Sequence, residues 1–385
     1  MTLFFLSSGL FLGWSLGTNA AANVFGSAVG SKMISFKKAI AVFSVFVILG
    51  AVFQGGGASS TLDKLGAVDA IAGAFTVALA AALSVFIMTK NKVPVSTSQA
   101  VVGAIIGWNI FSGNPTDYNS LTKIASTWVI SPILGAVFAI LLYLLVKFII
   151  NRSKIHLIRL DSYLRVGLLI AGAFGSFSLG ANNIANVMGV FVTAAAPDKS
   201  IDLGLFALSG TQQLFLIGGI AVAIGAVTYS KKVMQTVGNN ILELSSESAL
   251  VVVLAHSLVL FVFSSQALQS FLISIGLPPI PLVPVSSSQA IVGAILGVGL
   301  LKQAREIKFN VIGGIAAGWI ITPIIAGLIS FFSLFFMSNV FNLEVAKSGS
   351  ADKNIDPHTN TSVTHSADST TSANDAYNYL DSIQE

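Results

Sequence analysis

The chain has 385 residues, of which 54% are hydrophobic and only 9% are charged. Soluble domains carry roughly 25% charged residues, so a water-soluble fold of this size could not cover its surface with so few charges. The lack of cysteine excludes disulfides, thiolate metal sites and thiol catalysis. The four histidines show no metal-ligand spacing, so we expect no metal centre and no cofactor. The composition predicts an integral membrane protein, in which the net charge of +4 is a topology signal and does not indicate nucleic-acid binding.

Ten apolar stretches, taken in chain order, come close to or exceed the roughly 20 residues that one membrane crossing needs. The stretches are 3–30, 39–57, 71–89, 93–111, 124–146, 166–196, 204–229, 248–276, 284–301 and 309–341. None of them contains Asp, Glu, Lys or Arg. Gly, Pro, Asn and Ser interrupt several stretches, which indicates discontinuous helices or re-entrant hairpins. We predict an all-α polytopic membrane protein with about 10–12 membrane segments.

Three sequence blocks occur twice, in the same order. Gly17–Gly26 returns as Gly180–Gly189, Pro94–Gly107 returns as Pro284–Gly297 with 11 of 14 positions identical, and Trp128–Ile133 returns as Trp319–Ile324. Three ordered matches are hard to obtain by chance. The sequence therefore predicts a duplicated membrane unit, with repeat 1 in residues 1–146 and repeat 2 in residues 166–341.

Loop charges indicate how the two repeats face the membrane. Where a loop of one repeat is basic, the matching loop of the other is not, as inverted repeats require. The basic linker 147–165 is then expected in the cytoplasm, and about five crossings per repeat place both termini outside. The tail, residues 342–385, is polar and acidic, and we expect it to be disordered. Whether 93–111 and 284–301 span or re-enter stays open.

Asparagine pairs stand inside the first duplicated block. Asn19 and Asn23 are four residues apart and share one face of a helix, and Asn182 and Asn186 repeat this spacing. Amides in hydrocarbon need a protein, water or solute partner. Packing between helices is the alternative interpretation, but the repetition in both halves favours a binding role.

The second duplicated block carries a proline followed by small hydroxyl residues. This pattern is typical of the first turn of a half-helix, whose free N–H groups and positive dipole end bind anions. An ordinary helix cap at the bilayer surface is the alternative. The candidate substrate-binding residues of this block are Ser96, Thr97, Ser98, Gln99, Ser286, Ser287, Ser288 and Gln289. His256 is a lone polar residue in an apolar stretch, and we interpret it as structural.

These duplicated blocks, together with Lys231–Gly238, resemble the inorganic phosphate transporter (PiT) family and its sulfate permease relatives, over nearly all of residues 1–341. The resemblance implies a secondary transporter of two inverted halves with an oxyanion site between them. It assigns the repeated asparagines, Asn19, Asn23, Asn182 and Asn186, to the signature positions of the family. It assigns the hydroxyl residues that follow the prolines to anion binding.

The sequence departs from the family at four positions. Ala20 and Asn183 stand where phosphate carriers have Asp, and Gln99 and Gln289 stand where His is common. Without an intramembrane carboxylate, a carboxylate proton relay is missing, whereas neutral oxygens can still bind sodium. The candidate coupling-cation residues are Asn19, Asn182 and Asn183. A donor-rich site without Asp also suits sulfate, which has no proton to donate.

The sequence therefore predicts a secondary active transporter of the plasma membrane that moves inorganic phosphate by alternating access, coupled to sodium. Sulfate or another tetrahedral oxyanion is the alternative substrate, and an anion channel is the less favoured alternative mechanism. An enzyme is not expected, because no base lies within sequence reach of the intramembrane serines. The expected partners are the anion and the lipid bilayer, and the sequence leaves open whether the chain forms a homodimer.

Overall fold

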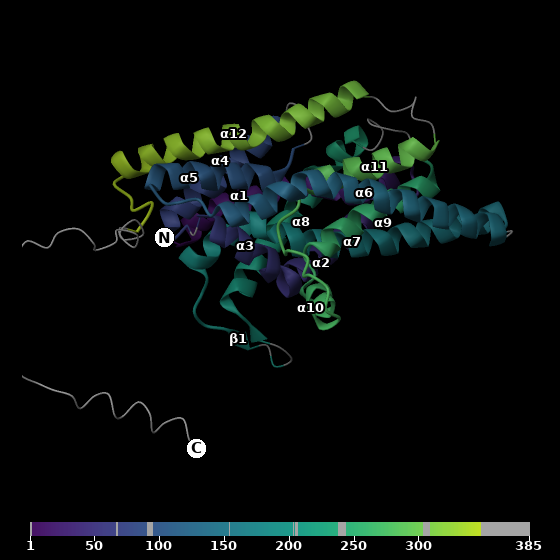
Figure 1. Cartoon of the computed structure of the whole chain (residues 1–385), viewed down its shortest axis with the longest axis horizontal. Coiled ribbons are helices and arrows are strands. Elements are labelled where there is room, and N and C mark those ends of the chain that lie inside the picture. Colours follow the sequence, from purple (N-terminus) through teal and green to yellow (C-terminus); the bar gives the residue numbers. More distant parts are fainter. Residues whose placement is uncertain are drawn as a thin grey trace, which may run out of the picture. The chain divides into compact units, whose positions relative to one another are not determined.

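Helices make up almost all of the part of the chain that the structure describes. A computed structural model describes residues 2–66, 68–90, 95–153, 155–202, 204, 207–237, 244–302 and 309–347. Within these residues there are twelve α-helices and one short antiparallel pair of strands, in which Ile201 faces Leu208 (Figure 1). The prediction of an all-helical membrane fold is confirmed, since six of these helices, or seven with a bent pair, are long and apolar enough to span a bilayer.

The described elements follow the order of the predicted stretches. The first half holds α1 (Thr2–Gly30), α2 (Phe36–Gln54), α3 (Gly56–Gly66), α4 (Ile71–Lys90), α5 (Thr97–Ser112) and α6 (Tyr118–Ser153). The second half holds α7 (Leu157–Ala195), β1 (Ile201–Asp202), β2 (Ala207–Leu208), α8 (Gly210–Val237), α9 (Ser246–Val262), α10 (Gln266–Ser274), α11 (Ser287–Lys302) and α12 (Phe309–Asn339).

Two elements differ from simple crossings. Helix α3 falls mostly between the predicted stretches 39–57 and 71–89, because a search for long apolar runs misses an 11-residue helix rich in Gly and Ser. The stretch 248–276 forms α9 and α10, which are bent by 67° at the break between them. Helices α5 and α11 have 16 residues each, fewer than the roughly 20 that a crossing needs.

Local sequence defines the turn between α5 and α6. Gly113 ends α5 with φ of 71°, a left-handed conformation that glycine adopts without steric cost. Asp117 precedes α6 and accepts hydrogen bonds from the Asn119 N–H, at 3.0 Å, and from Ser120 Oγ, at 2.6 Å. The Ser120 hydrogen bond, above all, holds the pKa of the Asp117 carboxyl below its usual range.

The two halves interlock instead of forming separate domains. Helix α1 packs on α8 and α2 on α7, while α5 packs on α12 and α6 on α11. Each pair joins an element of one half to an element of the other, and the same contacts recur with the halves exchanged. Two-fold related repeats produce this pattern. The repeat boundaries at residues 146 and 166 therefore divide the sequence but not the packed core.

Glycines allow these cross-half contacts to be close. A Cβ added at any of four glycines would collide with a backbone carbonyl of the partner helix, which leaves no room for a side chain. The colliding pairs are Gly17 with Val222, Gly225 with Trp14, Gly180 with Val47, and Gly50 with Phe177. Gly103 meets Pro323 and Gly293 meets Pro132 in the same manner. The matched pairs show that both halves use the same packing at equivalent positions.

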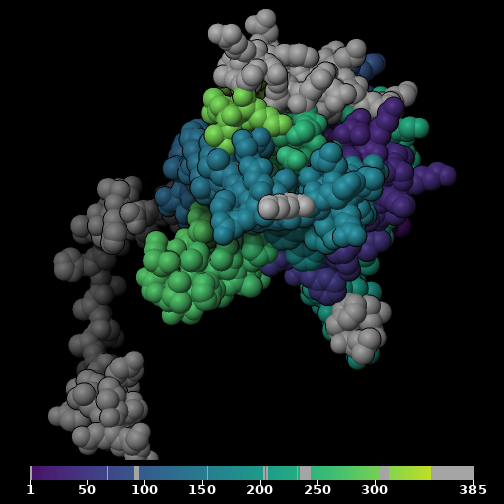
Figure 2. Space-filling model, turned by 90° about the vertical axis from the view of Figure 1, so that its right-hand side faces the viewer, coloured from purple at the N-terminus to yellow at the C-terminus, as the bar shows by residue number. Residues whose placement is uncertain are grey.

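The predicted linker 147–165 is mostly helical. Its residues complete α6, which ends at Ser153, and begin α7, which starts at Leu157. The ends of these two helices fill the middle of the face that Figure 2 presents, in blue and teal. Arg165 fixes the first turns of α7 by donating to Asp161, at 2.7 Å, and to the Met33 carbonyl, at 2.9 Å.

The chain that follows α12 returns to the bundle. Val345 is buried, and its carbonyl accepts from Trp108 Nε1 at 2.9 Å. The Lys347 N–H donates to Asp69 Oδ1 at 3.2 Å. The first residues of the predicted tail, 342–347, thus pack against the helices, while the tail predicted for 348–385 lies outside the described residues.

The glycine contacts can be tested by overpacking. We expect Gly180→Val to lower the free energy of unfolding by about 2 kcal/mol or more, because forcing methyl groups into a tight contact costs roughly 1–3 kcal/mol. Gly314→Val is the matched control, since an added Cβ there meets nothing within 4 Å. Thermal unfolding of the purified protein in detergent measures both. Equal melting temperatures for the two variants would contradict the interlocked packing.

Candidate functional site

The two half-helices that follow the Pro-Val-Ser sequences meet tip to tip. Ser98 Oγ donates to the Val285 carbonyl at 3.1 Å, and Ser288 Oγ donates to the Val95 carbonyl at 3.0 Å. Ser98 and Ser288 hold equivalent positions of the duplicated block, as do Val95 and Val285. The two contacts are therefore the same hydrogen bond, made once from each half. Residues far apart in the sequence are joined at one buried point.

Each tip begins a helix with a serine cap. Ser96 Oγ accepts from the Gln99 N–H at 3.3 Å, and Ser286 Oγ accepts from the Gln289 N–H at 3.3 Å. Pro284 is buried just before the second cap, whereas Pro94 lies outside the described residues. The first N–H groups of a helix have no partner within the helix. Both tips therefore present free donors and the positive ends of helix dipoles toward their meeting point.

Asn182 holds the second tip in place. Its Nδ2 donates to the Val283 carbonyl at 2.9 Å, and its Oδ1 accepts from the Val285 N–H at 2.7 Å. The Asn182 amide thus bonds the backbone on both sides of Pro284, and its N–H and its oxygen both have backbone partners. Asn19, the equivalent residue of the first half, instead donates to the Ser15 carbonyl, at 3.3 Å, and to Thr89 Oγ1, at 3.0 Å. Among the described residues, Asn19 has no hydrogen bond to Val95, the equivalent of Val285, so the two halves differ at this contact.

The other asparagine pair connects the long helices to the tips. Asn23 Nδ2 on α1 donates to Ser287 Oγ at 3.0 Å. Asn186 Nδ2 on α7 donates to Ser98 Oγ at 2.9 Å and to Asn183 Oδ1 at 3.2 Å. Each amide reaches the half-helix of the opposite repeat. The repeated asparagines therefore hold the two tips together through side-chain hydrogen bonds.

A small cavity lies beside the meeting point. It is lined by Leu16, Asn19, Ala20, Asn23, Val95, Ser96, Thr97, Asn183, Ser287 and Ser288. About 20 Å³ of it is open to the centre of a water molecule, which is room for roughly one water. Every lining side chain is uncharged, and most of the polar ones offer a hydrogen-bond donor. The cavity is built from both halves of the chain.

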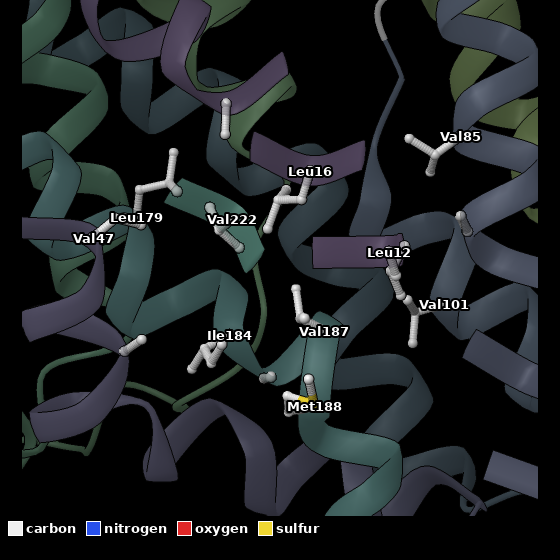
Figure 3. Packing of buried hydrophobic residues seen from close by; sticks show 14 of the residues in the cluster. Leu12, Leu16, Val47, Val85, Val101, Leu179, Ile184, Val187, Met188 and Val222 are labelled. Carbon is white, nitrogen blue, oxygen red and sulfur yellow. The ribbon is translucent and has the colours of Figure 1, made fainter. Parts of the chain in front are cut away.

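Apolar side chains pack next to the cavity. Figure 3 shows two pairs of equivalent residues from the two halves. Leu16 on α1 corresponds to Leu179 on α7, and Val47 on α2 corresponds to Val222 on α8. Together with Ile184 they line a narrow cleft that has no room for a water molecule. Leu16 and Asn183 border both spaces. Matched apolar residues thus exclude water on this side of the polar site.

The predicted site residues divide into two groups. Those that line the cavity are Asn19, Asn23, Ser96, Thr97, Asn183, Ser287 and Ser288. Those that are buried around it are Ser98, Gln99, Asn182, Asn186, Ser286 and Gln289. Ser286 Oγ and Ser288 Oγ lie 3.2 Å apart. Ala20 and Asn183, which stand at the Asp positions of the resemblance, both face the cavity.

Buried oxygen atoms without partners lie close to the tips. Among the described residues, Gln99 Oε1, Gln289 Oε1 and Asn186 Oδ1 have no hydrogen-bond partner. Gln99 and Gln289 are equivalent in the two half-helices, so the same acceptor is unpaired in each half. An unpaired buried acceptor costs free energy. These oxygens are therefore suited to an ion or water that the site takes up.

His256, which we interpret as structural from the sequence, contacts a residue that lines the cavity. His256 on α9 is fully buried, and its Nε2 lies 2.9 Å from Ser287 Oγ. Ser287 lines the cavity, so His256 is one side chain removed from it. The signal was available, because His256 is the one histidine within the ten apolar stretches. It is interpreted as structural in the sequence because it is a lone polar residue in an apolar stretch.

An all-helical membrane fold of two inverted repeats, with half-helix tips that meet at an internal polar cavity, defines the class of inverted-repeat membrane transporters. The chain belongs to the phosphate transporter family, whose sequence pattern matches residues 16–160 and, a second time, residues 156–330. The two matches reflect the duplication that the repeated blocks indicate.

Proteins named as a phosphate permease and as a sulfate permease are both similar to this chain along most of its length. A protein of Methanocaldococcus jannaschii that is provisionally named a phosphate permease is 30% identical over 316 residues, covering 82% of this chain and 91% of that protein. The sulfate permease CysP of Bacillus subtilis is 29% identical over 342 residues, covering 87% of this chain and 88% of that protein. Because the two sequence identities are nearly equal, they favour neither phosphate nor sulfate as the substrate of this chain.

A solved structure shares the fold. The structure of a sodium-dependent phosphate transporter superposes with a TM-score of 0.66 and covers 88% of this chain and 98% of that one, at 20% sequence identity. The match covers both repeats. It shows that the interlocked helices are an established arrangement, while the identity is too low to transfer any residue's role.

The clamp made by Asn182 gives a stability prediction. We expect Asn182→Ala to lower the free energy of unfolding by about 2 kcal/mol or more, because the buried Val283 carbonyl and Val285 N–H lose their partners. Asn183→Ala is the matched control, with an effect of about 1 kcal/mol, since it removes one hydrogen bond, from Asn186 Nδ2, and that amide keeps Ser98 as a partner. Thermal unfolding in detergent compares the two, and a larger loss for Asn183→Ala would refute the assignment.

Proposed function

We propose that the chain is a secondary active transporter that moves inorganic phosphate across the cell membrane by alternating access, coupled to sodium. The observation that carries this proposal is the meeting of two helix N-termini, one from each half, beside a cavity lined by amides and hydroxyls. Free N–H groups and dipole ends of this kind bind phosphate and sulfate oxygens. Membership of the phosphate transporter family supports the same substrate class.

The anion would be held without any basic side chain. The cavity-lining residues offer hydroxyl groups of Ser96, Thr97, Ser287 and Ser288 and the amides of Asn19 and Asn23. Neutral donors can replace the water shell of an anion but do not neutralise its charge. A cation that binds with the anion would supply that charge, which is the physical reason to expect symport.

Sodium fits the available oxygens. Hard cations accept neutral oxygen ligands, and the unpaired Gln99, Gln289 and Asn186 oxygens lie next to the tips. Of the cation residues proposed from the sequence, Asn182 already uses its oxygen on the backbone, whereas Asn19 and Asn183 line the cavity. The similar fold of a sodium-dependent phosphate transporter agrees with this ion. We therefore propose that glutamine oxygens complete the cation sites.

The difference between the halves supports alternating access. In this conformation Asn182 clamps the second tip, while Asn19, which has no hydrogen bond to Val95 among the described residues, donates to Thr89 and borders the cavity. Since the halves are duplicated, an exchange of these two arrangements would close the present cavity and open its counterpart. Such exchange between inverted repeats moves a central site from one side of the membrane to the other.

Sulfate remains the second candidate, because of what faces the cavity. Ala20 and Asn183 place no carboxylate there, so the site has no strong acceptor for the proton that phosphate carries near neutral pH, given a second pKa of about 6 to 7. Serine and asparagine oxygens can still accept that proton. The similarity to a sulfate permease is consistent with this alternative.

Orientation in the membrane is also part of the proposal. The basic end of α6, with Lys147 and Arg152, would face the cytoplasm, and both termini would lie outside. The repeats 1–146 and 166–341 would then face the membrane in opposite directions, with the tail 342–385 outside. The large apolar side chains exposed on α6 and α12 fit a lipid bilayer.

Uptake into proteoliposomes tests the function. We expect an inward sodium gradient to drive entry of labelled phosphate, and Thr97→Val to raise KM by about tenfold, because a hydrogen bond to a charged group contributes about 1.5–3 kcal/mol. Thr76→Val is the matched control, since this buried hydroxyl bonds only the Ala72 carbonyl of its own helix. Phosphate entry that ignores both the gradient and Thr97→Val would refute the proposal.

Competition decides between the two anions. If excess sulfate abolishes labelled phosphate entry while excess phosphate leaves labelled sulfate entry unchanged, sulfate is the substrate. If phosphate blocks sulfate entry instead, the first assignment holds. Repeating both measurements at pH 6 and pH 8 separates the effect of the protein from the changing protonation of phosphate, because sulfate has no proton to lose in this range.

The orientation can be measured on a single helix. Asn119 and Ser153 lie at opposite ends of α6, 34 residues apart, which is about 50 Å along the axis. The chain has no cysteine, so Asn119→Cys and Ser153→Cys each introduce one unique thiol. We expect a membrane-impermeant maleimide to label Asn119→Cys on intact cells and Ser153→Cys only after permeabilisation. The reverse labelling would invert the proposed topology.

A further inference from the structure

A buried imidazole contacts the wall of the anion cavity. His256 lies on α9 with no exposed surface, and its Nε2 is 2.9 Å from Ser287 Oγ. Its Nδ1 has no hydrogen-bond partner among the described residues. Ser287 in turn lines the cavity and receives the Asn23 amide at 3.0 Å. A titratable group thus stands behind one of the proposed anion ligands, and the mechanism above does not use it.

The hydrogen-bond capacity of Ser287 makes this contact consequential. A hydroxyl has one proton to donate and can accept two hydrogen bonds. Asn23 Nδ2 already donates to Ser287 Oγ. If His256 Nε2 also donates, the Ser287 proton is free to point at an anion. If His256 Nε2 is unprotonated, Ser287 donates to the ring and has no proton left for the cavity.

Other charges are remote from the imidazole. The helices that pack on α9 are α1, α6, α7 and α11, and α1 carries no titratable residue. The titratable residues of the other three and of α9 itself are Tyr118, Lys123, Tyr143, Lys147, Arg152, Arg159, Asp161, Tyr163, Arg165, Lys302 and Glu247. Among the described residues, none of them has a hydrogen bond or ion pair with His256.

Two of these charged residues, Glu247 and Lys302, lie at the start of α9. Lys302 Nζ donates to Ser245 Oγ at 2.8 Å, and Ser245 is 11 residues before His256, about 16 Å along the helix. The cavity itself is lined by uncharged side chains. An anion in the cavity would therefore be separated from the titratable ring of His256 by Ser287 alone.

We propose that His256 is a positioning residue that, through Ser287, makes anion binding depend on pH. In the protonated ring both nitrogens are donors, so Nε2 fixes Ser287 as a donor to the anion, and the ring adds a positive charge one side chain away. By linkage, a bound anion favours uptake of a proton from solvent by the ring, and release of the anion favours its return. This inference rests on the proposed anion site and adds its regulation.

The test compares pH profiles of KM in proteoliposomes of the full chain, with labelled phosphate and labelled sulfate. For the wild type we expect KM to fall by about tenfold as pH drops from 7 to 4.5, since burial lets the ring take up its proton only in acid and the positive charge then strengthens anion binding. His256→Gln keeps an amide donor toward Ser287 but cannot titrate. Its KM should stay flat on acidification instead of following the wild-type fall, with kcat changed less than KM.

Two further variants separate positioning from a structural role. His256→Leu removes both the donor and the charge, and its KM should be raised at every pH. Ser257→Ala, next in sequence, is the control, because its hydroxyl bonds the Val253 carbonyl of its own helix, and it should keep the wild-type profile. Dividing each variant's KM by the wild-type KM at the same pH cancels the changing protonation of phosphate.

The outcomes are distinct. A His256→Gln profile that follows the wild type in both substrates overturns the inference while leaving the transporter assignment intact. A wild type that takes up neither anion overturns the proposed function instead. If His256→Leu does not fold, as judged by its melting temperature in detergent, the KM–pH profile of His256→Gln still tests the inference. A flat profile supports the role of His256, and a profile that slopes like the wild type contradicts it.

Discussion

The site depends on a reciprocal pair of hydrogen bonds between two helix tips. Ser98 bonds the Val285 carbonyl and Ser288 bonds the Val95 carbonyl, so each half closes onto the backbone of the other. Neither bond can form within one repeat. The asparagines of α1 and α7 reinforce the junction from outside. Since this junction brings two donor-rich helix tips and the asparagines of two long helices to one point, every functional proposal for the cavity follows from it.

The polar junction is stable inside a membrane because the helices around it approach closely. Glycines at matched positions let α1 cross α8 and α2 cross α7 with backbone contact. Apolar pairs such as Leu16 with Leu179 then exclude water next to the site. In such surroundings a hydrogen bond is stronger and an unpaired group more costly than in water. Because the cavity is lined by uncharged side chains, the charge of a bound anion would have to be balanced by a cation or a proton.

Much of this arrangement could be predicted from repetition. The duplicated blocks identify the asparagines and hydroxyl residues that surround the cavity, and the apolar stretches locate the helices. Three features could not be predicted in this way. Helix α3 is too short for a hydropathy criterion, the bend between α9 and α10 has no sequence repeat, and His256 has no partner nearby in sequence. Each depends on contacts between segments that are distant along the chain.

The sequence by itself determined the membrane class, the duplication and the chemistry of the candidate ligands. Hydrophobic composition, repeated blocks and helix-capping residues can each be recognised within a short segment, without knowledge of the contacts between segments. Only the tertiary structure decided which ligands share a cavity. It placed Thr97 and Ser287 in the wall, turned Asn182 toward the backbone, and set His256 behind Ser287. The reason is that equivalent residues of two repeats have equal local sequence but unequal neighbours once the halves interlock.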